Sequence, residues 1–174
     1  MADSSPRNVS DLDRVDRQIL DELQSDGRLA VAELARRVHL STTPCLERMR
    51  RLERDGFIKD YIARLDIRRL GFDLLAFIEV SLDRTNPDFF ERFRLAVGEI
   101  DEVIECHMVA GNFDYLLKVR AVSMVAFRRF LVEKLTSIAG LQNTHTYFTL
   151  EEIKADARLP LTPVASARSR KRRS

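Results

Sequence analysis

Hydrophobic positions divide the chain into an N-terminal part with a helical repeat and a C-terminal part in which strands and helices alternate. In the first part, apolar residues recur every three or four positions over residues 12–23, 31–38 and about 41–55. This spacing is typical of short helices that bury one face. Pro44 lies in the first turn of the third segment, and Gly56 follows its end. Three short helices with a tight turn before the third predict a helix-turn-helix.

The helix boundaries follow from local chemistry. Ser41 or Thr43 is placed to cap the third helix, whereas Ala30 leaves the second helix without a polar cap. His39 lies at the tight corner, which needs a positive φ, and histidine tolerates that region better than most residues. We therefore expect His39 to be a backbone position and not a ligand.

The C-terminal part predicts a βαββαβ order, which is the ferredoxin-like arrangement of an α+β fold. Helices are expected from Asn86-Pro87 and from Ser123 to near Gly140, and residues 111–114 are expected to form a hairpin turn. The predicted strands are residues 57–65, leading out of the helical part, and then 74–82, 103–110, 115–122 and 144–153. The predicted domains are an N-terminal tail (1–11), a helix-turn-helix with its linker (12–73, the linker being 66–73), a sensing and oligomerisation domain (74–157) and a basic tail (158–174).

The third helix carries candidate DNA contacts. At about 100° per residue, its buried side is predicted to hold Cys45, Leu46, Met49, Leu52 and Glu53, with Thr43, Glu47, Arg51 and Arg54 opposite. Arginine pairs with guanine, glutamate accepts from cytosine, and hydroxyls near a helix start hold phosphates. The predicted DNA-binding residues are Ser41, Thr42, Thr43, Glu47, Arg48, Arg50, Arg51 and Arg54. A packing module with a salt-bridged surface is the alternative.

One face of the predicted sheet should cover the two helices, and the other face is half apolar. Its apolar residues are expected to be Phe77, Val103, Val109, Leu116 and Val122, with Glu79, Glu105, Lys118 and Arg120 among them. Such a face is too apolar for open water, so we expect the same face of a second copy to cover it. The resulting two-fold dimer would present two recognition helices to a pseudo-palindromic site on double-stranded DNA.

Charge is distributed unevenly along the chain. The 174 residues carry a net charge of only +2, but residues 1–64 are neutral, 65–157 sum to −4 and 158–174 to +6. Residues 36–54 alone reach +4 through arginine, which is a nucleic-acid footprint. The basic tail is expected to be disordered and either to contact phosphates or to keep the chain soluble. No apolar run approaches the ~18 residues of a membrane span, and no secretory signal or disulfide framework is present, so a cytoplasmic protein is expected.

Catalytic and metal motifs are missing from the sequence. The three histidines fall in different elements, and no His-Glu-x-x-His, Cys-x-x-Cys or Gly-x-Gly-x-x-Gly pattern occurs. Cys106 and His107 are neighbours on a strand and should point to opposite faces. We therefore predict neither an enzyme, nor a metal site, nor a cofactor.

Several long motifs occur in a familiar order. They are Leu12-Asp-x-x-Asp-x-x-Ile-Leu, Pro44-Cys-Leu-Glu-Arg-Met-Arg-Arg-Leu-Glu-x-x-Gly-Phe-Ile, Glu105-Cys-His and Gly111-x-Phe-Asp-Tyr-Leu-Leu-Lys. Over about residues 11–157 the chain resembles the Lrp/AsnC (feast/famine) transcriptional regulators. The resemblance implies a winged or simple helix-turn-helix reader, an amino-acid-sensing βαββαβ domain, and homodimers that assemble into octamers or larger rings around which DNA wraps. It also implies a nucleoid-associated protein whose effector is leucine or another branched-chain amino acid.

The same resemblance implies an effector site between subunits. Carried over by motif, it comprises Gly111, Asn112, Asp114 and Tyr115 at the hairpin, with Thr144 and Thr146 from a neighbouring chain. Asp114 would accept from the ammonium of an amino acid, while turn N–H groups and threonine hydroxyls would donate to its carboxylate. Asn112 stands where the relatives are expected to have aspartate, and His39 where they often have glycine. The alternative is that Asn112 and Asp114 only build the turn.

Other functions stay open at this point. The chain could be an architectural DNA-wrapping protein with little ligand response, or a metal-responsive regulator. It could also be a ligand-binding or enzymatic βαββαβ module whose helical part contacts protein.

Overall fold

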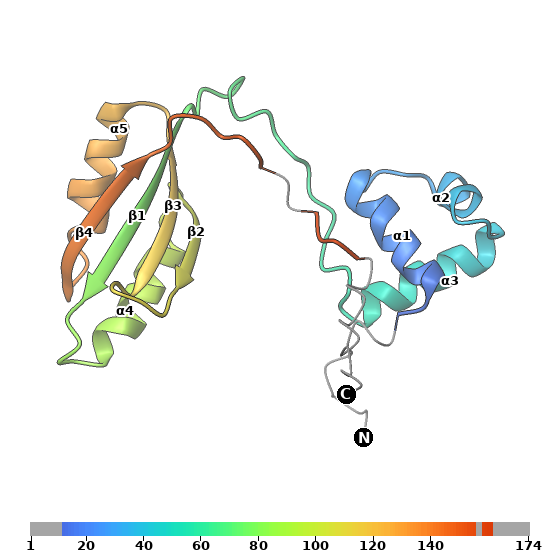
Figure 1. The fold of residues 1–174 in the computed structure, drawn as a ribbon, viewed down its shortest axis with the longest axis horizontal. Coiled ribbons are helices and arrows are strands. Elements are labelled where there is room, and N and C mark those ends of the chain that lie inside the picture. Colours follow the sequence, from blue (N-terminus) through green and yellow to red (C-terminus); the bar gives the residue numbers. More distant parts are fainter. Residues whose placement is uncertain (1–11, 156–157, 162–174) are drawn as a thin grey trace, which may run out of the picture. The chain divides into compact units, whose positions relative to one another are not determined.

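The computed structural model describes residues 12–155 and 158–161. Residues 1–11 of the predicted N-terminal tail and 162–174 of the predicted basic tail lie outside the described residues. The chain divides into two compact units (Figure 1), of which the first comprises residues 1–64 and 156–174 and the second comprises residues 65–155. The segment predicted as a linker, residues 66–73, thus groups with the second unit.

The first unit is the predicted three-helix arrangement, with α1 (Arg14–Ser25), α2 (Val31–Arg37) and α3 (Thr42–Arg54) around one apolar core. Asp13 and Asp16 form a reciprocal capping box at the start of α1. Ala30 precedes α2 without a side-chain cap, as expected. His39 has a φ of 57°, so the predicted positive φ at the corner is confirmed.

Two predictions for this unit were wrong. Residues 59–66 are exposed and form no strand, because the described part of this unit offers no second strand to accept their hydrogen bonds. Residues 158–161, expected to be disordered, pack on α1. The Leu159 N–H donates to Gln24 Oε1 at 2.7 Å, and Leu161 joins the helical core.

The second unit is a four-stranded antiparallel sheet in the order β2-β3-β1-β4, which confirms the ferredoxin-like fold. Helices cover one face of the sheet (Figure 1). The elements are β1 (Leu74–Leu82), α4 (Asp88–Gly98), β2 (Val103–Met108), β3 (Tyr115–Ala121), α5 (Met124–Arg129), a π-helical segment η2 (Phe130–Leu135) and β4 (Leu141–Phe148). Among the described residues, no helix is long and apolar enough to cross a membrane.

The last strand begins and ends earlier than the predicted 144–153. It starts directly after Gly140, whose φ of 86° turns the chain into the sheet. Phe148 pairs with Ala76, which is only two residues from the start of β1. Beyond Phe148 almost no neighbouring strand is left to pair with, so β4 ends there.

Alternation along β1 and β3 builds the core of the second unit. The helix side of the sheet buries Ile78, Val80, Leu117 and Val119 against aromatic and aliphatic side chains of the helices, as the pattern predicted. Val103 was assigned to the open face, and this was wrong. It pairs with the buried Val119 and packs on the core, because a bulge between Val103 and Glu105 shifts the alternation of β2 by one residue.

Candidate DNA-binding surface and effector site

Helix α3 presents a row of polar side chains to solvent. Its first turn shows three exposed residues with hydroxyl side chains, Ser41, Thr42 and Thr43, and Ser41 makes no side-chain cap bond. Glu47, Arg50 and Arg54 continue the exposed row toward the end of the helix. This row contains six of the eight predicted DNA-binding residues.

The other two predicted residues, Arg48 and Arg51, have partners inside the unit. Arg48 Nη1 lies 2.8 Å from one carboxylate oxygen of Asp16, and Arg51 Nη2 lies 2.6 Å from the other. Arg48 also pairs with Asp13. Because Asp16 is only 1% exposed, its charge needs these partners. Arg51 was predicted to point outward, but Asp16 holds it against α1.

Glu53 was predicted on the buried side of α3 and is exposed. It lies at the edge of the apolar stripe, in the last turn of the helix, where the Tyr61 hydroxyl donates to its carboxylate at 2.9 Å. Cys45 and Leu52 form the buried centre of the stripe, with Leu46 and Met49 half-buried beside them.

Helix α2 carries a compact ion-pair cluster. Glu33 accepts hydrogen bonds from Arg36 and Arg37 at 2.7–2.9 Å. These bonds lower the pKa of Glu33 to about 2. Arg37 also donates to Glu22 of α1 at 2.9 Å, so the two arginines of this cluster are matched by two carboxylates.

The hairpin between β2 and β3 is held together by Asp114. This residue is 6% exposed, and its two carboxylate oxygens accept from the Leu82 N–H at 2.8 Å and from Arg84 Nη2 at 2.8 Å. Its backbone N–H also donates to the Val80 carbonyl at 2.9 Å. The acceptor that the resemblance implies for an effector ammonium thus already accepts hydrogen bonds from Leu82 and Arg84 within the chain.

The remaining predicted effector residues fall into two groups. Gly111 and Asn112 are exposed at the tip of the hairpin, while Tyr115 is buried on the helix side of β3. Thr144 and Thr146 pair with Val80 and Ile78, so they lie on the helix side of β4 and are half-buried. Tyr115 and Thr144 flank Val80 from its two sides, which brings β4 and the base of the hairpin to the same end of the sheet.

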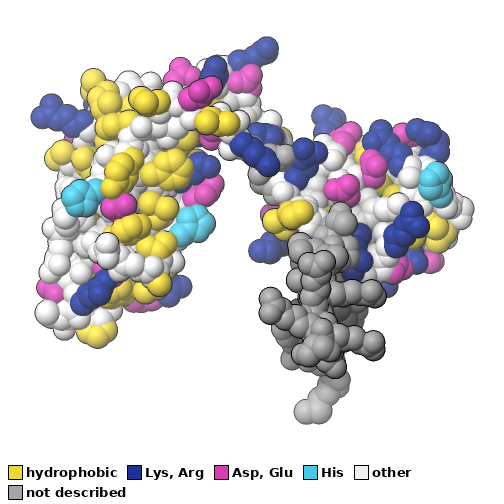
Figure 2. Space-filling view, in the orientation of Figure 1, with side chains coloured by type: hydrophobic (Ala, Val, Ile, Leu, Met, Phe, Trp, Pro, Cys, Tyr) yellow, Lys and Arg dark blue, Asp and Glu magenta, His cyan; other side chains and the backbone are white. Residues whose placement is uncertain are grey.

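The open face of the sheet gathers hydrophobic side chains with charged groups and histidines among them (Figure 2). Phe77 and Leu116 are half-buried on it, as predicted, and Tyr147 opposite Phe77 is 54% exposed. The negative charge of Glu79 raises the pKa of Tyr147. Cys106 and His107 point to opposite sides of β2, since their partners are Leu117 and Leu116.

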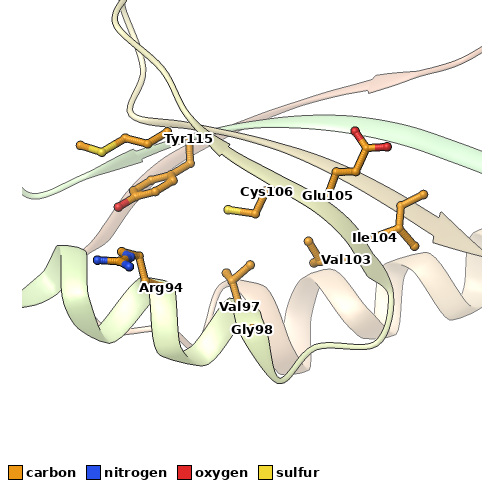
Figure 3. Close-up of a pocket in the computed structure, with 9 residues that line it drawn as sticks. Arg94, Val97, Gly98, Val103, Ile104, Glu105, Cys106 and Tyr115 are labelled. Atoms are coloured by element: carbon orange, nitrogen blue, oxygen red, sulfur yellow. The ribbon is translucent and has the colours of Figure 1, made fainter. Parts of the chain in front are cut away.

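A cavity between α4 and β2 was not predicted from the sequence (Figure 3). Its walls come from α4, from β2 and from Tyr115 of β3, and β2 is an edge strand whose alternation is broken by the bulge. A bulge leaves no local signature in the pattern of this segment, so no signal in the sequence located the cavity.

Comparisons with known proteins cover both units. The family described as Lrp/AsnC ligand binding domain matches residues 75–159, and the one described as winged helix-turn-helix DNA-binding matches residues 12–59. The leucine-responsive regulatory proteins of Salmonella typhimurium and Escherichia coli are 52% identical to this chain over 159 residues, covering 91% of this chain and 97% of each relative.

Solved structures agree with these sequence matches. A transcriptional regulator from Neisseria meningitidis in complex with L-Met superposes with a TM-score of 0.84 at 40% identity, covering 87% of this chain and 97% of that one. AsnC of E. coli superposes with a TM-score of 0.78 at 27% identity, covering 86% and 98% of the two chains.

Proposed function

The chain belongs to the Lrp/AsnC family of DNA-binding transcriptional regulators, and we propose that it reads a pseudo-palindromic operator with the exposed row of α3 under the control of an amino acid. Leucine or another branched-chain amino acid is the proposed effector. The observation that carries the DNA part is the exposed row of hydroxyls, Glu47, Arg50 and Arg54 along one side of a helix whose opposite side is anchored in the core.

Within this proposal some residues of α3 contact DNA and others orient the helix. Ser41, Thr42 and Thr43 hold phosphates at the start of the helix, and Glu47, Arg50 and Arg54 reach base edges or phosphates along the major groove. Arg48 and Arg51 orient α3 through their ion pairs with Asp16. A helix that is fixed to the core in this way loses little conformational entropy when it enters the groove.

The proposed assembly is a homodimer formed through the open face of the sheet, with dimers joining into octamers or larger rings. Phe77, Leu116 and Tyr147 supply apolar contacts, and the charged groups among them set the register of the two copies. Such a dimer doubles the number of recognition helices. This matters because residues 1–157, the chain without its basic tail, carry a net negative charge.

For the effector we propose the exposed tip of the hairpin, Gly111 and Asn112, together with Thr144 and Thr146 of a neighbouring chain. The backbone N–H groups of the tip and the threonine hydroxyls are donors suited to the carboxylate of an amino acid. Asp114 shapes the tip through Leu82 and Arg84. The names of the relatives, leucine-responsive regulatory protein and a regulator bound to L-Met, support this class of ligand.

The test is operator binding measured over a range of salt concentrations with each amino acid in turn. Arg50→Ala and Arg54→Ala are expected to weaken operator binding by about 10-fold or more, and each lost phosphate contact lowers the salt slope by about 0.9. Arg92→Ala removes an exposed arginine of α4 and serves as the control, with unchanged binding. If both α3 variants bind the operator like the control, the proposed DNA surface is refuted. If none of the twenty amino acids changes affinity or oligomer size, the sensing part is refuted and an architectural role follows.

A further inference from the structure

The cavity between α4 and β2 has the size and lining of a small-molecule site (Figure 3). Its volume is about 510 Å³, within the range of about 300–1,000 Å³ common for ligand pockets. The apolar part of the wall includes Val97, Val103, Ile104 and Met108. Of the predicted effector residues, only Tyr115 contributes to it.

Two features of the chain keep this space open. The bulge after Val103 turns both Val103 and Cys106 toward the helix. Gly98 leaves the floor without a side chain, and an added Cβ there would meet no atom within 4 Å. The cavity therefore results from the backbone of β2 and from one glycine, and not from loose side chains.

Tyr115 lines one end of this cavity and carries a buried, unsatisfied hydroxyl. The residue is 2% exposed, and its ring is held by Phe93 at a centroid distance of 4.7 Å and by Phe90 at 6.2 Å. Among the residues that the structure describes, none forms a hydrogen bond with the buried hydroxyl. Burial raises the pKa of Tyr115, so the hydroxyl is a neutral donor at physiological pH. A buried donor without a partner is costly, and a ligand atom that accepts from it removes that cost.

The charged groups of the lining indicate the sign of the charge that a ligand would carry. Arg94 extends toward the Tyr115 hydroxyl at one end of the cavity (Figure 3), and its pairing with Glu91 at 3.1 Å is solvent-exposed. Glu105 is the acidic residue of the lining, but its oxygens are taken by Lys118 at 3.0 Å and His107 at 3.3 Å. This end of the cavity thus offers two donors, Arg94 and the Tyr115 hydroxyl, and the nearby carboxylates are paired, Glu91 with Arg94 and Glu105 with Lys118 and His107.

We propose that this cavity binds a small aliphatic carboxylate, with the carboxylate between Arg94 and the Tyr115 hydroxyl and the hydrocarbon chain against Val97, Val103 and Ile104. A carboxylate accepts from a guanidinium and a phenol at once, and a branched chain of four to six carbons fits an aliphatic wall. An α-amino acid would need an additional free acceptor for its ammonium, and neither Glu91, which is paired with Arg94, nor Glu105, which is paired with Lys118, supplies one. The site is therefore separate from the effector site at the hairpin tip and selects the acid without the amino group.

The two cysteines provide a local readout of occupancy in the full chain. Cys106 lines the cavity and is exposed, whereas Cys45 is fully buried in the helical unit. Alkylation by iodoacetamide, followed by mass spectrometry, therefore reports on Cys106. The probe is 4-methylpentanoate, which has the side chain of leucine and no amino group, and L-leucine is the comparison. Calorimetric titration of the same protein gives the affinity.

Three variants separate the contributions of the Tyr115 hydroxyl and of Arg94 to binding of 4-methylpentanoate. Tyr115→Phe removes the hydroxyl and keeps the ring, so the fold is expected to be at least as stable while 4-methylpentanoate binds about 10- to 100-fold more weakly. Arg94→Gln should weaken binding by a similar factor. Tyr61→Phe removes a hydroxyl from the other unit and serves as the matched control, with wild-type affinity.

The expected result is that 4-methylpentanoate slows alkylation of Cys106 in wild type and in Tyr61→Phe but not in Tyr115→Phe, and that L-leucine has no effect on it. Absence of protection, or protection that survives in both Tyr115→Phe and Arg94→Gln, would overturn the site. Protection by L-leucine with the same dependence on Tyr115 would overturn the selection against the amino group. Because operator binding is not part of this readout, failure here leaves the proposed regulator function unaffected, and loss of amino-acid control over DNA leaves this site unaffected.

Discussion

Asp16 links the two helices that build the DNA-binding surface, and its replacement by asparagine tests how that surface is held. The Asp16 carboxylate is 1% exposed and accepts from Arg48, from Arg51 and, at 3.1 Å, from the Asp13 N–H. In Asp16→Asn the shape is kept, but one oxygen becomes an NH₂ group that faces a guanidinium donor. The variant therefore loses the charge and gains a clash between donors in a buried place.

Breaking a buried ion pair by changing one partner costs about 3–5 kcal/mol. The side chains of Arg48 and Arg51 are 31% and 40% exposed, so solvent screens part of the interaction and we expect the lower end, about 3 kcal/mol. A small unit has a total stability of about 5–15 kcal/mol, so this is a large share. With a urea dependence of about 1–3 kcal/mol per M, the unfolding midpoint should fall by roughly 1–3 M.

The measurement is hydrogen exchange of peptides from α1 and α3 in the full chain at increasing urea concentration. Peptides from β1 and β3 report the second unit and should not change. Asp21→Asn removes the same charge from an exposed position of the same helix and is expected to stay within about 0.5 kcal/mol of wild type. If Asp16→Asn matches Asp21→Asn, the ion pairs do not hold α3, and the assignment of Arg48 and Arg51 as orienting residues fails.

Three further changes test other features of the fold. Gly140→Ala should destabilise the fold by about 2–4 kcal/mol, because φ is 86° and the new Cβ would lie 2.2 Å from Phe89 Cγ. Gly98→Ala, at a helix position with open space around it, should be neutral or stabilising by up to about 1 kcal/mol. Thermal unfolding compares the two variants, and equal effects would contradict the positive φ and close packing at Gly140. His39→Gly relieves a φ of 57° and should raise stability by about 0.5–1 kcal/mol in urea titrations, whereas a loss would mean that the imidazole makes a stabilising contact. Glu33 has its pKa lowered from 4.5 to about 2 by its two arginine partners, so its stabilising effect is complete above pH 4.5 and is lost as the pH falls toward 2. The melting temperatures of wild type and Glu33→Gln should therefore differ at pH 6 and converge near pH 2, and a constant difference across that range would refute the assignment.

Local patterns were sufficient for most elements of this fold. The three helices, the βαββαβ order and the positive φ of His39 depend on apolar spacing, on capping residues and on turn chemistry, all of which act over a few neighbouring residues. The strand predicted at residues 57–65 failed because a strand needs a partner, and the pattern of one segment does not reveal whether a partner exists.

The predicted sites show the same difference between what local sequence determines and what tertiary contacts determine. The sequence by itself determined which residues could contact DNA or an effector, since charge, hydroxyls and family motifs are properties of single positions. Only the tertiary structure decided which partners these residues have within the chain: Arg48 and Arg51 pair with Asp16, and Asp114 accepts from Leu82 and Arg84. It also decided that Tyr115 reaches a cavity with a free hydroxyl. The physical reason is that a buried charge is satisfied by whichever groups the fold brings within about 3 Å, and these groups come from segments far apart in the chain.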